Sequence, residues 1–134
     1  MIKLVDECNK IIAKYSKNIE NKLNVTSTVQ ILKEVLPDHY FLGESSTLEG
    51  VISDETKIIV IYPHNIWLNH CALIPEEYML KEFKWNVIRV YVHEMRHLWQ
   101  IENNLFYSNN AEIDADNFAL KYINALLKKG EIYE

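Results

Sequence analysis

Residues 75–101 read PEEYMLKEFKWNVIRVYVHEMRHLWQI, and this stretch decides the fold. It opens with a proline and two acids, which favour a first helical turn because proline presets the backbone and acids face the positive end of the helix dipole. After Pro75 no glycine or proline interrupts it. The sequence therefore predicts one long helix to about Ile101. Its apolar side repeats at helical spacing and consists of Phe83, Val87, Ile88, Val90, Tyr91, Met95 and Leu98.

A second helix is expected directly after this one. A polar loop, residues 102–110, separates them, and apolar residues at helical spacing resume from about Ala111 to Lys129. Gly130 then supplies the residue type that commonly ends a helix in the left-handed conformation. The C-terminal part of the chain is thus predicted to be a helix, a loop and a helix.

Two further helices are expected near the N-terminus. Apolar residues of segment 1–17 recur every three or four positions, with charged residues between them. Ser27 and Gln30 match a capping box, and Pro37 would stop a helix that begins there. We therefore expect one helix over residues 1–17 and another from about Ser27.

The middle of the chain changes from helical to strand-like patterning. Three short runs rich in β-branched and aromatic residues are separated by polar turn residues, and we interpret them as strands: Tyr40–Leu42, Leu48–Ile52 and Lys57–Tyr62. The last two should form a hairpin. Residues 64–74 fit either a loop or a fourth, edge strand around Cys71–Ile74.

The fold class that follows is α+β in a single domain over residues 1–134. It combines N-terminal helices, a small sheet of three or four strands, the long helix and a C-terminal helix. A chain of 134 residues with 49% hydrophobic content can bury a core without the help of disulfide bonds or structural metal ions. Three glycines and three prolines fit neither a disordered nor a collagen-like chain.

Charge and apolar patterning exclude several kinds of partner. The net charge of −5 argues against nucleic acid, whose binding draws on Lys and Arg. The longest uninterrupted apolar run, Ile58 to Tyr62, is far shorter than the ~20 residues that cross a membrane.

Charges in the opening MIKLVDECNK break any secretion signal, so Cys8 and Cys71 are expected to be reduced thiols in a cytoplasmic protein. The oligomeric state is left open.

The long helix contains His93-Glu94-Met95-Arg96-His97, an H-E-x-x-H motif. Four residues of α-helix advance about 6 Å and rotate close to one full turn. Both imidazoles therefore leave the same face and can bind one metal ion. Glu94 lies beside that face, where it can polarise a metal-bound water.

Two histidines leave such a site incomplete, because catalytic zinc usually has three protein ligands and an open position. Glu112 opens the last helix, 15 residues after His97, and is the candidate third ligand. Asp116 lies one turn further on the same face and can orient a histidine through its other ring nitrogen. Asp114 is expected to face solvent. Arg96 is expected to pair with Asp116, with a neighbour of Glu112 or with an acid of its own helix.

HEMRH followed by Glu112-Ile113-Asp114-Ala115-Asp116-Asn117-Phe118-Ala119 resembles the gluzincin metallopeptidases. The segment E-x-x-A-D-x-F-A is similar to small ImmA/IrrE-type peptidases, and HEMRHLWQ looks like zincins of phages and mobile elements. The resemblance implies a minimal zincin-like fold. It also implies Zn²⁺ held by His93, His97 and Glu112.

If the resemblance holds, the protein is a zinc-dependent endopeptidase with a narrow protein or peptide substrate, and Glu94 is its general base. The oxyanion needs a further donor, for which Tyr107, His64 and His70 are candidates. The predicted hairpin offers a sheet edge that could pair with extended substrate. The alternative is a zincin-fold module that binds zinc and regulates or interacts without cleaving. A nucleic-acid-associated protease is disfavoured by the charge.

Overall fold

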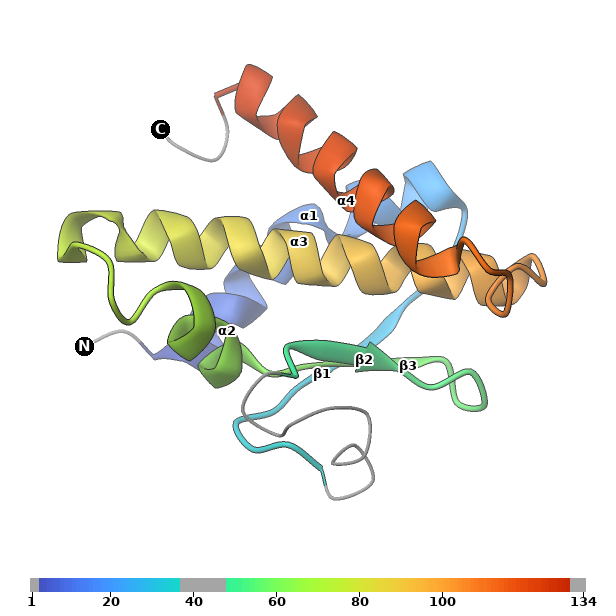
Figure 1. Cartoon of the computed structure of the whole chain (residues 1–134), viewed down its shortest axis with the longest axis horizontal. Helices are drawn as coiled ribbons and strands as arrows, with labels where there is room; N and C mark the ends of the chain where they lie inside the picture. Colours follow the sequence, from blue (N-terminus) through green and yellow to red (C-terminus); the bar gives the residue numbers. More distant parts are fainter. Residues whose placement is uncertain (1–2, 37–47, 131–134) are drawn as a thin grey trace.

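The computed structural model of the protein describes residues 3–36 and 48–130, and it has the α+β architecture that the sequence predicts (Figure 1). The predicted strand Tyr40–Leu42 lies outside the described residues. In chain order the elements are α1 (Leu4–Leu23), β1 (Thr28–Ile31), β2 (Gly50–Ile52), β3 (Ile58–Ile61), α2 (Pro63–His70), α3 (Glu76–Glu102) and α4 (Ala111–Lys128).

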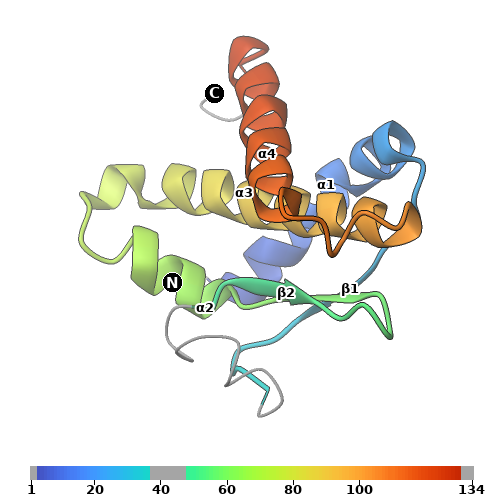
Figure 2. The ribbon, with the colours of Figure 1, turned by 45° about the vertical axis from the view of Figure 1, so that its right-hand side comes forward.

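Helix α3 is the central element of the molecule. It contacts every other helix and the strands β2 and β3. The sheet lies along one side of α3 and the first turns of α4 lie across the other, as the two views in Figures 1 and 2 agree. This placement explains why α3 is buried along much of its length, with Phe83, Val87, Val92 and Met95 fully inaccessible.

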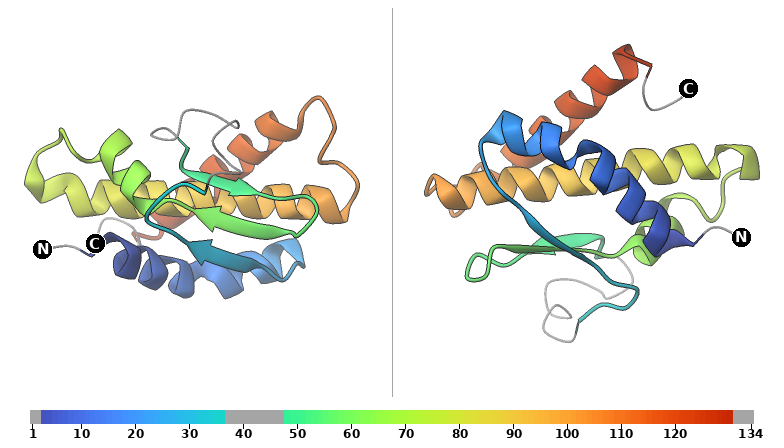
Figure 3. Two further views of the ribbon diagram at one scale, coloured as in Figure 1. Left: turned by 90° about the horizontal axis from the view of Figure 1, so that it is seen from below. Right: turned by 180° about the vertical axis from the view of Figure 1, so that it is seen from behind.

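The described residues form a sheet of three strands in the order β1-β3-β2, so β3 is central among them (Figure 3). β1 runs parallel to β3, with Thr28 opposite Ile58, and β2 runs antiparallel to β3, with Val51 opposite Val60. The predicted hairpin of the last two strands is therefore confirmed. Central β3 is buried at three of its four residues, and Ile59 and Ile61 belong to the hydrophobic core.

The predicted second N-terminal helix is wrong, because residues 28–31 form strand β1. Exposed and half-buried residues alternate along this strand, and Val29 and Ile31 pack on the core. A period of two is a strand signal that the capping-box match concealed. The hydroxyl of Ser27 caps no helix; it donates to Glu20 of α1 and shares a hydrogen bond with Tyr91 of α3.

Residues 63–70 form helix α2, where the sequence suggested a loop or an edge strand. Pro63 ends the third strand as predicted, but it also occupies the first turn of this helix, the position that suits its missing N–H. Ile66 is fully buried, and Trp67 packs edge-on against Phe83 of α3 at 5.6 Å between ring centroids. Burial of these two side chains holds a helix whose sequence has little helical periodicity.

The remaining helices follow the prediction. The N-terminal helix extends from Leu4 to Leu23, longer than expected, and α3 and α4 end within a residue or two of their predicted limits. Gly130 has a φ of 72°, the conformation expected after a helix end. Within the described part of the chain, no helix combines the length and apolar character needed to cross a bilayer.

Both cysteines are buried free thiols. Burial raises the pKa of Cys8 to about 12. Burial, followed by the charges of Glu82 and Glu49, raises the pKa of Cys71 to about 11. Both side chains therefore stay protonated and act as small apolar groups in the core.

Strand β2 approaches α3 closely at Gly50. A Cβ atom placed there would lie 2.6 Å from Cγ1 of Val90 and 3.4 Å from Cγ of Glu94. The absence of a side chain at this position sets the distance between the edge of the sheet and the helix that carries the H-E-x-x-H motif.

We predict that Gly50→Ala lowers the free energy of unfolding by about 1–3 kcal/mol, the usual cost of overpacking. Urea denaturation followed by circular dichroism measures the loss. Val90→Ala removes the clashing atom, so Gly50→Ala should cost clearly less in that background. If Gly50→Ala lowers the free energy of unfolding equally in wild type and in Val90→Ala, the contact with Val90 is not the cause.

Candidate metal centre

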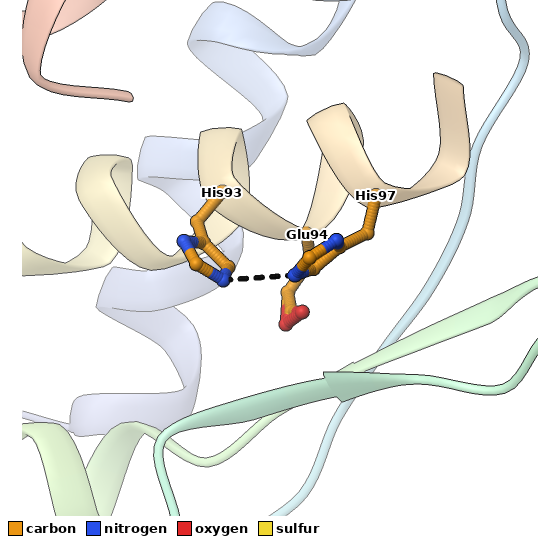
Figure 4. Close-up of side chains that lie close together, drawn as sticks. All are labelled: His93, Glu94 and His97. Carbon is orange, nitrogen blue, oxygen red and sulfur yellow. Dashed lines mark hydrogen bonds between the residues drawn. The ribbon is translucent and has the colours of Figure 1, made fainter. Parts of the chain in front are cut away.

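His93 and His97 extend from the same face of α3 toward the sheet (Figure 4). Their Nε2 atoms are 3.0 Å apart, and the two rings meet edge to face at 4.6 Å between centroids. His97 is buried, and its ring also forms a T-shaped pair with that of Phe106 at 5.4 Å between centroids. The helix thus presents two ring nitrogens to one point, as the four-residue spacing predicts.

Glu112, in the first turn of α4, brings a carboxylate to the same point. Its Oε1 lies 2.9 Å from Nε2 of His97, and its Oε2 lies 3.2 Å from Nε2 of His93. The Glu112 side chain is 73% exposed, whereas that of His97 is 5% exposed. The carboxylate therefore approaches the buried histidines from the solvent side.

The outer ring nitrogens of both histidines face acceptors. Nδ1 of His93 is 2.9 Å from Oδ1 of Asp116, and Nδ1 of His97 is 2.7 Å from Oε1 of Gln100. The Gln100 amide nitrogen donates to Asp114 and to the carbonyl of Ala111, so its oxygen is the atom that faces His97. A neutral imidazole in either position therefore carries its proton on Nδ1.

This arrangement turns two lone pairs and a carboxylate toward one another. With Nδ1 protonated, each Nε2 is an acceptor, and a cation between these atoms is what makes their approach favourable. Burial and then the neighbouring His97 lower the pKa of His93, although Glu112 and Asp116 act in the opposite direction. The environment thus favours the neutral imidazole that metal ligation requires.

Glu94 is buried below the two histidines, and its carboxylate points toward the sheet in Figure 4. Burial, and then the charge of Glu112, raises the pKa of Glu94 to about 8. A divalent cation at the histidines would oppose this shift, because it favours the ionised carboxylate. A carboxylate whose pKa is raised by burial and lowered by a cation can both take up and release a proton near neutral pH.

The histidines and Glu94 line a cavity of about 1190 Å³, to which α3, the start of α4 and all three described strands contribute residues. Strand β2 contributes Gly50, Val51 and Ile52 to its wall, and Glu112 and Asp116 contribute from α4. A volume of this size has room for a peptide segment beside the histidines.

Asp114, expected to face solvent, is instead the partner of Arg96. Arg96 Nε is 2.8 Å from Oδ2 of Asp114, and Nη2 is 3.2 Å from Oδ1. The guanidinium also lies 3.8 Å from the ring centre of Trp99 and 4.8 Å from that of Phe118. The helical geometry of α4 alone predicts that Asp114 faces solvent, but α3 crosses this turn and brings Arg96 to it.

The three candidate oxyanion donors lie in different surroundings. The hydroxyl of Tyr107 donates to Asp54 in the turn between β2 and β3, and the side chain is largely exposed. Nε2 of His70 is 2.5 Å from Oε2 of Glu49. His64 is half-buried, and burial followed by the charge of Lys33 lowers its pKa. The role of each in oxyanion stabilisation stays a prediction.

Two polar side chains of this region had no place in the sequence argument. Gln100 bridges His97 to α4, as described above. Arg89 lines the cavity one turn before His93 and donates to Oε1 of Glu49 at 2.7 Å. Their spacing from the motif could have identified them. Arg89 precedes His93 by four residues and Gln100 follows His97 by three, and residues at these spacings are neighbours on a helix surface.

The structure thus has a group of residues that could hold a metal ion, formed by His93, Glu94 and His97, with Glu112 and Asp116 sharing His93 in a second, overlapping group. No known protein family, curated protein or solved structure matches this chain.

We predict that the purified protein binds one divalent metal ion per chain and that His97→Ala abolishes this stoichiometric binding. Removal of one converging nitrogen leaves an incomplete donor set. Elemental analysis after dialysis measures the content, and circular dichroism checks that the variant is folded.

His70→Ala is the matched control, because His70 also contacts a glutamate but lies on α2. This variant should keep the full metal content. A His97→Ala protein that is folded and retains its metal would contradict the assignment.

Proposed function

We propose that the protein is a zinc-dependent endopeptidase that hydrolyses peptide bonds of a narrow protein substrate. The observation that supports this most directly is the convergence of the two Nε2 atoms and the Glu112 carboxylate beside a buried glutamate at a cavity. His93, His97 and Glu112 are the proposed ligands, as in the gluzincins that the motif resembles. The protein would then act on a peptide, without a nucleic-acid or membrane partner.

The donor set fits zinc in chemistry and in size. Zinc accepts two imidazoles and one carboxylate as a catalytic ligand set. In a tetrahedral shell with ligands at about 2.0–2.2 Å, neighbouring ligand atoms are about 3.4 Å apart. The observed separations of 3.0, 2.9 and 3.2 Å are slightly shorter. Small side-chain adjustments would therefore suffice.

Zinc bound there would supply a water of lowered pKa and a Lewis acid for the scissile carbonyl. The Glu94 carboxylate takes the proton of the attacking water and passes it to the leaving amine. Asp116 and Gln100 hold the Nδ1 protons of the two histidines, which keeps both imidazoles in the ligating tautomer. Tyr107, His64 and His70 remain the candidate donors to the oxyanion.

The edge of the sheet provides a place for an extended substrate. Among residues 3–36 and 48–130, β2 has β3 as its single neighbour in the sheet, and Gly50–Ile52 line the same cavity as the histidines. Backbone groups on the side of β2 away from β3 can pair with a substrate strand, as in strand addition. The edge is β2, since the strand at Lys57–Tyr62 forms the centre of the sheet.

We predict that Glu94→Gln retains zinc and lowers peptide cleavage by at least about 10²-fold, because the amide cannot accept the proton of the attacking water. Cleavage is followed by mass spectrometry of new N-termini in a proteome-derived peptide mixture. Glu77→Gln, an exposed position in the first turn of the same helix, is the control and should cleave like wild type.

Normal cleavage by Glu94→Gln would remove Glu94 from the mechanism. If zinc-loaded wild type cleaves nothing in the mixture and nothing among proteins encoded near its gene, the alternative gains support. The chain would then be a zinc-binding module that regulates or interacts, as the resemblance to phage and mobile-element zincins also allows.

A further inference from the structure

We propose that Gln100 is a positioning residue of the metal centre, which fixes the tautomer of His97 and couples it to the helix that carries Glu112. This inference rests on the proposed zinc site and deepens it. Gln100 lies one helical turn after His97 and is 1% exposed, so water does not compete for its amide.

The hydrogen bonds of Gln100 determine how its amide is oriented. Nε2 donates to the backbone carbonyl of Ala111 at 2.9 Å and to Oδ2 of Asp114 at 2.9 Å. Both partners accept only, so they require the nitrogen on their side. The oxygen must then face His97, where it lies 2.7 Å from Nδ1. One side-chain orientation satisfies all three contacts.

This orientation has a chemical consequence for His97. An acceptor at Nδ1 places the proton there and leaves the Nε2 lone pair directed at His93 and Glu112. Without that acceptor, the carboxylate of Glu112 at 2.9 Å favours a proton on Nε2 instead. A proton on Nε2 blocks metal ligation by that nitrogen.

The same amide also holds the start of α4. Ala111 and Asp114 flank Glu112, so two of the contacts of Gln100 fix the turn from which the Glu112 carboxylate extends. Arg96 strengthens this turn by its paired contacts with Asp114. Two ligands from different helices are therefore positioned through one buried side chain.

Gln100→Met tests the proposal, because it keeps the length of the side chain and removes both polar functions. In metal-free protein at about pH 8.5, where imidazole is neutral, we expect ¹⁵N NMR to show His97 protonated on Nδ1 in wild type. In the variant we expect the proton on Nε2. Zinc affinity, measured by competition with a chromophoric chelator, should fall roughly 10- to 100-fold.

The double variant Gln100→Glu with Asp114→Asn provides a rescue. The carboxylate introduced at position 100 would again accept from His97. The amide introduced at position 114 would donate to that carboxylate, while its oxygen would still accept from Arg96. The carboxylate also faces the Ala111 carbonyl, which loses its donor in the double variant. We therefore expect the Nδ1 tautomer to return while zinc affinity recovers only in part. Tyr91→Phe controls for general destabilisation. Tyr91 lies on α3, as Gln100 does, but the hydrogen bond that this change removes joins Tyr91 to Ser27 and lies away from the site.

An unchanged His97 tautomer in folded Gln100→Met would overturn the proposal. So would a loss of zinc affinity no larger than that of Tyr91→Phe, or a folded double variant in which the proton of His97 stays on Nε2. A wild type that binds no zinc would overturn the proposed function, and the tautomer measurement would still decide the role of Gln100. If Gln100→Met loses cleavage but keeps the zinc affinity and the His97 tautomer of wild type, the positioning role of Gln100 would also be contradicted.

Discussion

The site depends on one geometric constraint: His93 and His97 are separated by one turn of a helix that cannot rotate. Helix α3 contacts the sheet and every other helix, and its fully buried residues fix its rotation about its own axis. Any rotation would move both imidazoles away from Glu112. Burial of an apolar side chain is typically worth about 1.5–3 kcal/mol, so several such residues hold this orientation firmly. The position of the candidate metal ligands is thus a consequence of core packing.

The elements that sequence predicted correctly are those with strong local signals. α3 and α4 have long apolar repeats with Pro75 or Gly130 at their ends, and such repeats survive in any tertiary context. β1 and α2 lack them. The segment at Thr28–Ile31 becomes a strand because β3 offers a parallel partner, and residues 63–70 become helical because Ile66 and Trp67 find places in the core. These partners are distant in sequence, so a local pattern could not reveal them.

The site shows the same contrast between what local sequence patterns predict and what contacts between distant elements determine. Helical spacing alone places His93, His97 and Glu94 together, and it identifies Glu112 and Asp116 as neighbours of one another. Spacing does not say how α4 crosses α3, and that crossing decides whether Asp114 meets solvent or Arg96. The roles of Gln100 and Arg89 became visible only with the contacts across elements. Local geometry predicts candidate ligands, whereas their supporting hydrogen bonds are a property of the packed structure.

Burial also gives the site its electrostatic character. It raises the pKa of Glu94 and lowers that of His93, because each charged form alone is poorly solvated there. A divalent cation would offset both penalties, since it stabilises the ionised glutamate and needs the neutral imidazole. Glu112 and Asp116 remain 73% and 64% exposed, so these carboxylates keep much of their hydration. The buried half of the site therefore gains most from a cation, while the exposed half supplies negative charge at little desolvation cost. Three carboxylates, those of Glu94, Glu112 and Asp116, thus lie around the two histidines in a chain of net charge −5.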